Sequence, residues 1–392
     1  MMQKPLLSVV IPTHNRSQYA LSTIKSLIAL SSDIQIVVCD TSSDDVISTE
    51  FLNESNRGRL NIIRPPNNLS VVDNFNEALK YAKGHYVIFI GDDDFVTASV
   101  VEIAKWAKDN DVDAIRCTFP ASYYWPDYYS QYFKDGYAAK LAVRSFTGSI
   151  KSLNSKEAYL TALDSLGGGV GEMPRAYLGL ISMNLISAIE KKFGKLFGGV
   201  SPDIYSAALI SNTASKVVDI DYPFIIPGHS GVSTSGQSAS GGHRGKLRDN
   251  DHIRPFVDLK WDVLIPEYYS VPTVWGYSLF KAVEKTGIGS PNLERLYVKC
   301  MLYNTRYWPY TIKSIAARMH NSGVLRVVYK IILSFIIEIR IQLARILNRI
   351  KKPSATGQSD TVFKSITDTE QASITLDAYL KSKPIIWKRF ND

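Results

Sequence analysis

The chain has 392 residues, of which 45% are hydrophobic, and it carries a formal net charge of +8. This length allows two or three domains with buried cores. Its three cysteines, Cys39, Cys117 and Cys300, lie far apart without metal-ligand spacing, which excludes a zinc or disulfide framework. No uncharged run of about 18 residues predicts a membrane span, and the N-terminal apolar run is too short for a signal peptide. We therefore expect a cytoplasmic protein.

Strands and helices alternate along the first part of the chain. The run "LLSVVIP" is continuous and β-branched, which is typical of a strand buried on both faces. Ser17 is expected to cap the first helix, and Gly84 to end a later one. We predict strands at 6–12, 34–40, from Leu60 and at 86–90, with helices at 17–30 and 72–82. The order predicts an α/β fold with a parallel sheet.

The stretch "VIFIGDDDFV" places three carboxylates directly after a buried strand. Mutual repulsion makes such a cluster costly unless a cation, backbone N–H groups or water meet it. A solvated acidic turn without a function is the simpler interpretation. However, ligands of open parallel sheets bind outside the carboxyl ends of the strands, and Thr13, Asp40 and Asp92 to Asp94 would all gather there. The sequence therefore predicts a ligand site at this edge.

These residues resemble the GT-A fold glycosyltransferases of family 2, an inverting group that includes bacterial polysaccharide-building enzymes. The likeness is carried by "SVVIPTHNR" (8–16), "VVCDTSSDD" (37–45) and "NNLSVVDNFNEALKYAKGHYVIFIGDDDF" (67–95). It implies a Rossmann-like nucleotide-sugar-binding domain and a nucleoside-diphosphate-sugar donor, foremost a UDP sugar. It also implies Mn²⁺ or Mg²⁺ at the acidic turn, since these hard cations prefer carboxylate and phosphate oxygens.

The resemblance also implies roles for individual residues. Asp40 would face the base and ribose, although Cys39 holds an acidic slot of the family pattern and Thr41 a glycine slot. The donor-binding positions are Pro12, Thr13, Asn15, Arg16, Asp40, Asn74 and Asp92. The metal-binding positions are Asp92, Asp93 and Asp94, with the principal ligand left open between Asp93 and Asp94.

An inverting transfer needs a general base for the acceptor hydroxyl. Family members carry an acidic residue roughly a hundred residues after the metal motif, at the start of a helix. Asp203 in "GGVSPDIYSAALI" fits, because Ser201 and Pro202 predict a helix beginning there. A capping carboxylate without chemistry is the alternative interpretation. Glu172, in the glycine-rich "GGGVGEMPR", is the second candidate.

Residues 227–250 are rich in Gly and Ser and then basic, which predicts a mobile loop. Such a loop can close over a nucleotide, and Arg244 could neutralise the diphosphate together with Lys246 and Arg248. His229 could complete the metal shell, as a histidine does in some family members. A simple solvated connection is the alternative.

We predict three regions. Residues 1–255 form the glycosyltransferase domain, with a donor half at 1–117 and an acceptor half at 118–255. Residues 256–352 form a helical region, and 353–392 are a linker and tail.

Residues 324–352 predict one long amphipathic helix. Arg326, Lys330, Ser334, Glu338, Arg345 and Arg349 trace its polar side. The opposite side, here named the apolar stripe, comprises Val328, Ile332, Phe335, Ile339, Leu343, Ile346 and Ile350. Such a helix either lies on the inner face of an anionic membrane or docks on protein, and the sequence favours neither.

Three functions are compatible with these patterns. The first is a metal-dependent inverting glycosyltransferase acting on a glycan or lipid-linked acceptor in capsule, O-antigen or exopolysaccharide synthesis. The second is a haloacid-dehalogenase-like phosphatase with Asp92 as nucleophile, and the third is a non-catalytic nucleotide-sugar-binding module. Nucleic-acid binding is not expected, since the basic residues concentrate in the 227–250 loop and the C-terminal helix.

Overall fold

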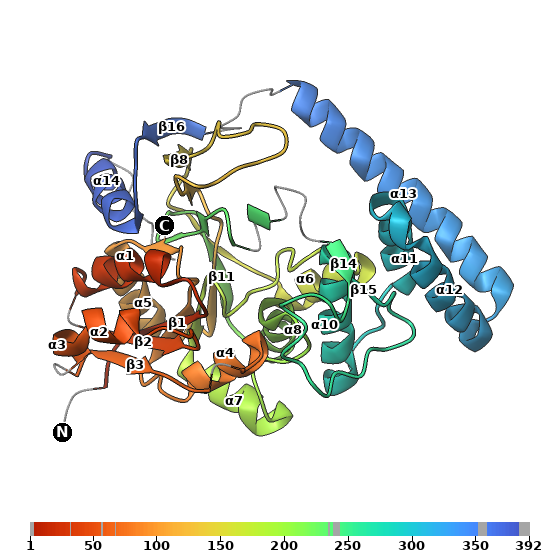
Figure 1. The fold of residues 1–392 in the computed structure, drawn as a ribbon, viewed down its shortest axis with the longest axis horizontal. Helices are drawn as coiled ribbons and strands as arrows, with labels where there is room; N and C mark the ends of the chain where they lie inside the picture. Colours follow the sequence, from red (N-terminus) through yellow and green to blue (C-terminus); the bar gives the residue numbers. More distant parts are fainter. Residues whose placement is uncertain are drawn as a thin grey trace.

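The computed structural model describes residues 4–31, 33–55, 58–66, 68–233, 236–237, 244–351 and 359–383. An α/β domain built on one large sheet is followed by a helical arm that projects to one side (Figure 1). The predicted fold class, a Rossmann-like α/β domain with a mostly helical C-terminal region, is confirmed.

The central sheet has eight strands in the order β3-β2-β1-β4-β10-β6-β11-β9. The first four in this order run parallel, β10 is antiparallel to both of its neighbours, and β11 is parallel to β6. The strands are β1 (Leu7–Thr13), β2 (Ile34–Asp40), β3 (Leu60–Ile63), β4 (Tyr86–Phe89), β6 (Ala114–Cys117), β9 (Ile150–Ser152), β10 (Gly179–Ser182) and β11 (Val217–Ile220). Because β1, β2 and β4 are parallel, their carboxyl ends meet at one edge, as the sequence predicts.

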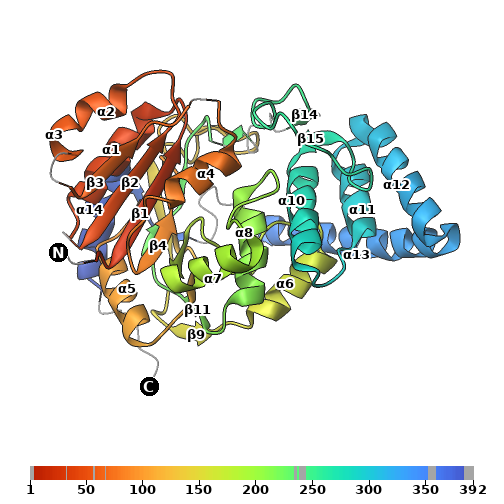
Figure 2. The same cartoon turned by 90° about the horizontal axis from the view of Figure 1, so that it is seen from below.

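Helices cover both faces of this sheet (Figure 2). One hydrophobic core packs α1 (Ser17–Ile28) and α5 (Ser99–Asp109) against the sheet. The other core packs α4 (Val71–Leu79), α7 (Met183–Phe193) and α8 (Pro202–Thr213) on the opposite face. The short helices α2 (Val46–Glu50) and α3 (Leu52–Ser55) follow β2. The first helix begins at Ser17 as predicted, but its N-cap residue is Arg16 rather than Ser17.

Short strands surround the acidic turn. β5 (Phe95–Val96) follows the turn directly and pairs with β12 (Ile225–Ile226), which leads into β13 (Gly228–His229). β13 in turn pairs with β7 (Ala121–Tyr124), which pairs with β8 (Lys140–Arg144). The pairing of β12 with β5 therefore brings the beginning of the predicted loop 227–250 beside the three aspartates.

The arm is built from helices stacked beyond α8. Contacts join α8 to α10 (Val271–Thr286) and to α6 (Ser155–Asp164), and α10 to α11 (Leu293–Tyr303). The small sheet of β14 (Arg244–Lys246) and β15 (Tyr268–Ser270) precedes α10. The chain continues through a 3-10 turn at Thr305–Tyr307 into α12 (Trp308–Ser322) and α13 (Val324–Lys351), which is the predicted amphipathic helix. Within the described ranges, no helix is both long enough and apolar enough to cross a membrane.

The end of the chain returns to the sheet domain, which differs from the predicted linker and tail at 353–392. β16 (Ser359–Lys364) pairs antiparallel with β8, and α14 (Thr369–Lys381) packs on α1 (Figure 1). Ala372 and Leu376 of α14 are fully buried in the core that contains α1. Their apolar positions four residues apart on one helix face were the available sequence signal. Residues 352–358 and 384–392 lie outside the described part of the chain.

A buried ion network fixes α13 on α11. Glu338 Oε1 accepts hydrogen bonds from Arg295 Nε at 2.9 Å and Arg295 Nη2 at 2.6 Å. Lys299 Nζ lies 3.6 Å from the same oxygen. The side chains of Glu338 and Arg295 are 2% and 5% exposed, so each depends on the other for compensation of its charge.

We expect Glu338→Gln to lower the free energy of unfolding by about 3 kcal/mol, because it leaves two cations without a buried counter-ion. Urea unfolding measures the change. The matched control is Glu284→Gln, whose exposed pair with Lys281 on α10 should be worth less than about 0.5 kcal/mol. Equal effects of the two substitutions would contradict a structural role for the network.

Candidate functional site

One arginine holds two carboxylates of the acidic turn. Arg16 Nη1 lies 2.9 Å from Asp92 Oδ1, and Arg16 Nη2 lies 2.9 Å from Asp93 Oδ2. Thr13 donates a hydrogen bond of 2.6 Å to the other Asp92 oxygen, and Ser230 Oγ donates one of 2.6 Å to Asp93 Oδ2. Asp92 and Asp93 are 2% and 3% exposed. Arg16 is therefore a positive charge that compensates two buried negative charges.

Asp94 is held by a different set of donors. Its Oδ2 accepts hydrogen bonds from the Gly91 N–H at 2.6 Å and the Tyr177 hydroxyl at 2.9 Å. Its Oδ1 accepts one from the Gly228 N–H at 2.7 Å. A Cβ atom at position 228 would lie 1.7 Å from the Asp93 carbonyl oxygen, so only glycine allows this close approach. The segment after β12 is thus fitted against the acidic turn.

Burial governs the protonation of these groups. It raises the pKa of Asp94 to about 7, and the charge of Asp93 adds to the rise. Burial likewise raises the pKa of Asp92 to about 6, against the opposing effect of Arg16. Burial alone would lower the pKa of Arg16, but the two carboxylates outweigh it and raise that pKa further above its ordinary value. The turn is stable as a charged cluster only with a cation beside it.

The predicted nucleotide side lies across β1 and β2. Thr13 and Asp40 are directly paired in the parallel register of these strands. The Asp40 side chain is fully buried, accepts a hydrogen bond from the Ser42 N–H at 2.9 Å, and lies 3.3 Å from Arg64 Nη1. Asn15 adopts a left-handed φ of 53° and accepts a bond from the Ser43 N–H at 3.0 Å. The loops after β1 and β2 are therefore joined to each other.

Asn74 lies beneath these loops on α4. Its side-chain nitrogen lies 3.3 Å from the Thr13 carbonyl oxygen and 3.4 Å from that of Cys39. Its side-chain oxygen is buried and accepts no hydrogen bond within the described structure. Pro12 is a half-buried residue of β1 paired opposite Cys39.

Asp203 lies in the first turn of α8, which begins at Pro202 as predicted. Its Oδ1 accepts hydrogen bonds from the Ser201 hydroxyl and from the Ile204 N–H at 2.9 Å. Burial lowers the pKa of Arg175, and Asp203 is close enough to oppose that shift. Two residues after Arg175 stands Tyr177, which bonds Asp94. The segment 175–177 therefore bonds the acidic turn through Tyr177 and carries, in Arg175, a cation that is influenced by the charge of Asp203.

Three other predicted residues are placed differently. Glu172 is 73% exposed and its nearest described cation is Arg116 at 3.9 Å. Arg244 is exposed on β14, and no described hydrogen bond or ion pair joins it to the aspartates. His229 stacks on Tyr124 with ring centroids 4.8 Å apart. Burial lowers the pKa of His229, and Asp93 opposes this shift. Residues 234–235 and 238–243 of the predicted loop 227–250 lie outside the described residues.

Several site residues carried no recognised sequence signal. Tyr177 and Ser230 bond the aspartates across long stretches of sequence. Thr23 of α1 donates to the backbone carbonyls of Asp92 and Asp94 at 2.8 and 3.1 Å. Thr23 also bonds Thr369 of α14 at 3.1 Å, so the chain end supports the turn from behind. Such contacts depend on tertiary packing, which single-sequence patterns do not contain.

The donor chemistry of the acidic turn fits a divalent cation. Its carboxylate oxygens are hard ligands, and Asp92 Oδ1 is buried without accepting a hydrogen bond. In the part of the chain that the structure describes, no three His, Cys, Asp or Glu side chains are already grouped to hold a metal ion. Since Arg16 occupies Asp92 and Asp93, its guanidinium and a metal ion would exclude each other there.

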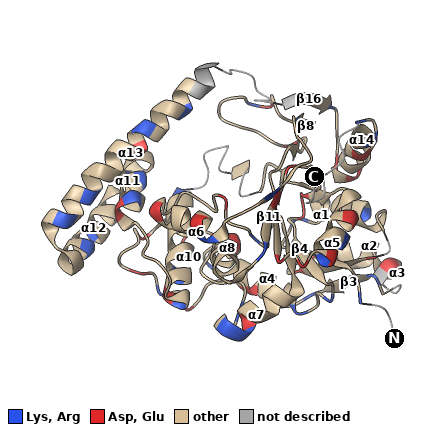
Figure 3. Ribbon diagram, turned by 180° about the vertical axis from the view of Figure 1, so that it is seen from behind, with Lys and Arg blue, Asp and Glu red and all other residues tan. Residues whose placement is uncertain are grey.

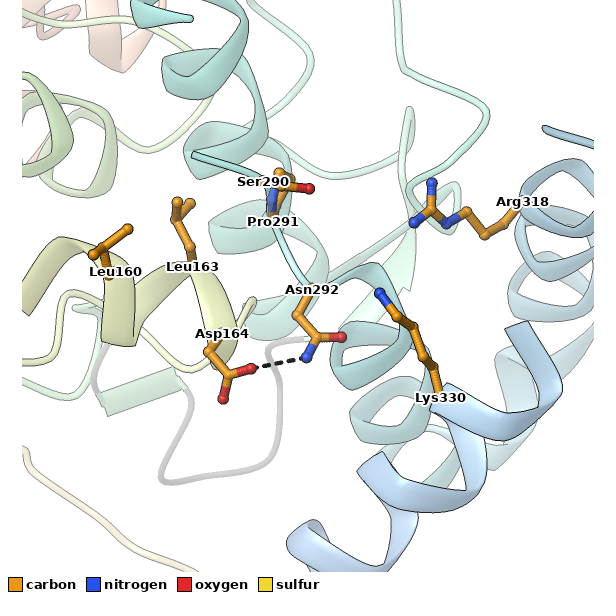
Figure 4. Close-up of a pocket in the computed structure, with 8 residues that line it drawn as sticks. All are labelled: Leu160, Leu163, Asp164, Ser290, Pro291, Asn292, Arg318 and Lys330. Carbon is orange, nitrogen blue, oxygen red and sulfur yellow. Dashed lines mark hydrogen bonds between the residues drawn. The ribbon is translucent and has the colours of Figure 1, made fainter. Parts of the chain in front are cut away.

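A separate cavity of about 280 Å³ lies where α6 meets the arm (Figure 4). It is lined from α6, α12, α13 and the connection before α11 by Leu160, Leu163, Asp164, Ser290, Pro291, Asn292, Arg318 and Lys330. Asn292 donates to Asp164 at 2.9 Å across its floor. None of the predicted site residues lines this cavity.

The geometry defines an α/β fold with an acidic turn at the carboxyl edge of its sheet. Comparison with known proteins agrees. Residues 8–152 match the model of glycosyl transferase family 2. The match confirms, over these residues, the resemblance found from sequence.

Individual relatives cover the same part of the chain. The chondroitin synthase of Pasteurella multocida is 25% identical over 139 residues, which are 32% of this chain and 14% of that protein. The glycosyltransferase GlyG of Streptococcus pneumoniae is 25% identical over 115 residues, 28% of this chain and 38% of that protein. The chain thus spans well under half the length of these relatives. Residues 1–349 of Staphylococcus aureus TarS, solved with UDP-GlcNAc, give a TM-score of 0.47 at 14% identity, with coverage of 84% of this chain and 89% of that TarS chain.

We expect Arg16→Gln to lower the free energy of unfolding by about 3 kcal/mol at about pH 8, because two buried carboxylates lose their cation. Adding Mn²⁺ should recover part of this loss, since an ion that binds only the folded state stabilises it. The loss should also shrink as the pH falls. The raised pKa values of Asp92 and Asp94 mean that the folded state takes up protons first, so stability from these groups declines as pH rises through about 6 to 7.

Thermal and urea unfolding measure these effects. The control is Lys25→Gln, whose exposed pair with Glu50 should contribute less than about 1 kcal/mol. An Arg16 variant as stable as the parent at high pH would show that the ion pairs do not hold the turn.

Proposed function

We propose that this chain is an inverting glycosyltransferase that moves a sugar from a nucleoside-diphosphate donor, foremost a UDP sugar, to a hydroxyl of a glycan or lipid-linked acceptor. The family of residues 8–152 supports the transferase class. The observation that carries the proposal is the acidic turn, with three buried carboxylates at the carboxyl edge of parallel strands. A cytoplasmic enzyme of capsule, O-antigen or exopolysaccharide synthesis has such a donor and acceptor.

The nucleoside would lie over the loops after β1 and β2. Asp40, buried and beside Arg64, can accept a base N–H or a ribose hydroxyl at the strand edge. The unpaired, buried side-chain oxygen of Asn74 is a second acceptor in the same place. Thr13 and Asn15 shape the loop that would approach the ribose.

The diphosphate would lie over Arg16 and the aspartates. An Arg16 side chain that turns from Asp92 and Asp93 toward the diphosphate would offer two N–H donors to phosphate oxygens. Asp92, Asp93 and Asp94 would then hold Mn²⁺ or Mg²⁺, with His229 as a candidate additional ligand, and the metal's charge would stabilise the departing diphosphate. Arg244 is a second candidate cation for the diphosphate, provided that the 227–250 loop closes.

The transfer itself would be a single displacement. The acceptor oxygen forms a bond to the anomeric carbon while the bond to the diphosphate oxygen breaks, and the configuration inverts. Asp203 takes the acceptor proton. The influence of its charge on Arg175, two residues from the Asp94 partner Tyr177, supports this role.

The phosphatase alternative would need Asp92 as a free nucleophile. Instead, one of its oxygens accepts a bond from Thr13 and the other lies 2.9 Å from Arg16. These contacts, together with the family, favour the transferase. The non-catalytic module is distinguished by experiment: purified protein is incubated with UDP and GDP sugars, with Mn²⁺, Mg²⁺ or EDTA, and release of nucleoside diphosphate is measured. Binding without release in every mixture would favour the module.

We expect Asp93→Asn to reduce metal-dependent release by about a hundredfold or more, since it removes a charged oxygen ligand at the diphosphate. The control is Asp109→Asn, an exposed carboxylate on α5. A variant that keeps full activity and the same response to Mn²⁺ would remove the metal site from the proposal.

We expect Asp203→Asn to bind donor with nearly unchanged affinity but to lose about a hundredfold in kcat, because the amide keeps the shape and lacks the basicity. Donor affinity by calorimetry and turnover by diphosphate release separate the two effects. Glu172→Gln is the matched comparison. If Glu172→Gln is inactive while Asp203→Asn is normal, the base is Glu172.

A further inference from the structure

The helix α13 buries residues of its polar side against α11, whereas a helix held by hydrophobic packing would bury its apolar side. Among its described side chains, up to residue 347, the buried ones are Val327, Ser334 and Glu338, at 0%, 3% and 2% exposure. Ser334 and Glu338 belong to the polar side predicted from sequence, and Glu338 is bound by Arg295 and Lys299 of α11. An amphipathic helix that docks to bury apolar area presents the opposite side. The ion network therefore fixes the helix in a chosen orientation.

This orientation leaves the apolar stripe in solvent. Ile332, Leu343 and Ile346 are 54%, 54% and 52% exposed. The stripe is widened on the same helix by Leu325 and Tyr329, at 88% and 62% exposure. Figure 1 shows α13 running along the outer edge of the arm, with α11 and α12 beside it. Monomeric proteins rarely expose an apolar surface of this length, and such surfaces mark contact with a partner or a membrane.

The charge of the molecule gathers at the same place. Residues 305–351 contain nine Lys and Arg and one acidic residue, Glu338, so this segment accounts for the whole formal charge of +8. The one acidic side chain is buried and paired. Arg326, Arg340 and Arg345 of α13 are exposed, with Arg326 and Arg345 on the polar side of the helix, and Figure 3 shows Lys and Arg along α12 and α13.

We propose that the basic and apolar surface of α13 docks flat on an anionic lipid surface, with the apolar stripe at the headgroup boundary. A helix that combines an exposed apolar stripe with exposed cations matches the two forces that hold an interfacial helix, apolar burial and attraction to anionic headgroups. A second copy of the chain is a poorer occupant, because two faces that each carry the full charge of +8 would repel. This inference does not depend on the proposed glycosyl transfer.

The full-length protein is tested by sedimentation with vesicles of phosphatidylcholine alone and of phosphatidylcholine with phosphatidylglycerol. We expect binding to the anionic vesicles, weakened by added salt, and little binding to the neutral ones. Replacing Arg326, Arg340 and Arg345 by Gln should weaken binding by about a hundredfold. Replacing Lys105, Lys156 and Lys191, which are exposed elsewhere, should change it far less.

The apolar component is tested by Ile332→Glu, Leu343→Glu and Ile346→Glu together, which should abolish vesicle binding. The matched control carries Leu52→Glu, Val257→Glu and Ile374→Glu, at apolar residues 63%, 87% and 65% exposed outside the arm, and should bind as the parent does. Circular dichroism confirms that both proteins are folded. Parent protein that ignores anionic vesicles at low salt overturns the proposal. So does a concentration-dependent dimer, seen by light scattering, that only the stripe substitutions dissociate.

Discussion

The compensation of buried negative charge at the acidic turn is the constraint on which the site depends. Asp92, Asp93 and Asp94 all lie below 4% exposure, where isolated carboxylates are too costly to keep charged. Arg16 from the loop after β1 compensates two of them, and Gly91, Gly228 and Tyr177 supply three hydrogen bonds to the third. These donors come from four separate parts of the chain. The loops converge because the carboxylates require partners, and a donor diphosphate would enter a place already organised around charge.

Arg16 also connects stability with the proposed chemistry. A guanidinium that holds two aspartates in the free protein is a cation placed where a sugar donor would bring two phosphate charges. Replacing it by a divalent ion exchanges one compensating cation for another, so the turn need not pass through an uncompensated state. The raised pKa values of Asp92 and Asp94 have the same origin, since burial penalises their charged forms, and for Asp92 the charge of Arg16 opposes this rise. The stability of the turn and the proposed donor binding thus depend on the same compensation of buried carboxylate charge.

The sequence was sufficient for the local elements and for their meeting at one edge. Continuous β-branched runs predicted β1 and β2 almost to the residue, and parallel order then placed Thr13 opposite Asp40. The sequence did not predict contacts between distant segments, such as the bonds of Ser230 to Asp93 and of Tyr177 to Asp94. The tail was misjudged for a related reason. Its helix is short and its buried residues Ala372 and Leu376 make a weak pattern, so the decisive factor was the complementary surface on α1.

The chain end that follows the arm contributes residues that support the acidic turn. After α13 the chain comes back to pair β16 with β8 and to place Thr369 against Thr23, whose hydroxyl holds the backbone of the acidic turn. Arg16 therefore holds the side chains of the turn, and Thr369 of α14 supports its backbone through Thr23. The middle of α13 is fixed by Glu338, and the chain after α13 continues into this tail. The surface that we assign to lipid and the carboxylates that we assign to the donor are therefore connected through one stretch of chain. A lipid-linked acceptor held at that surface would meet a site whose supports include the same polypeptide segment.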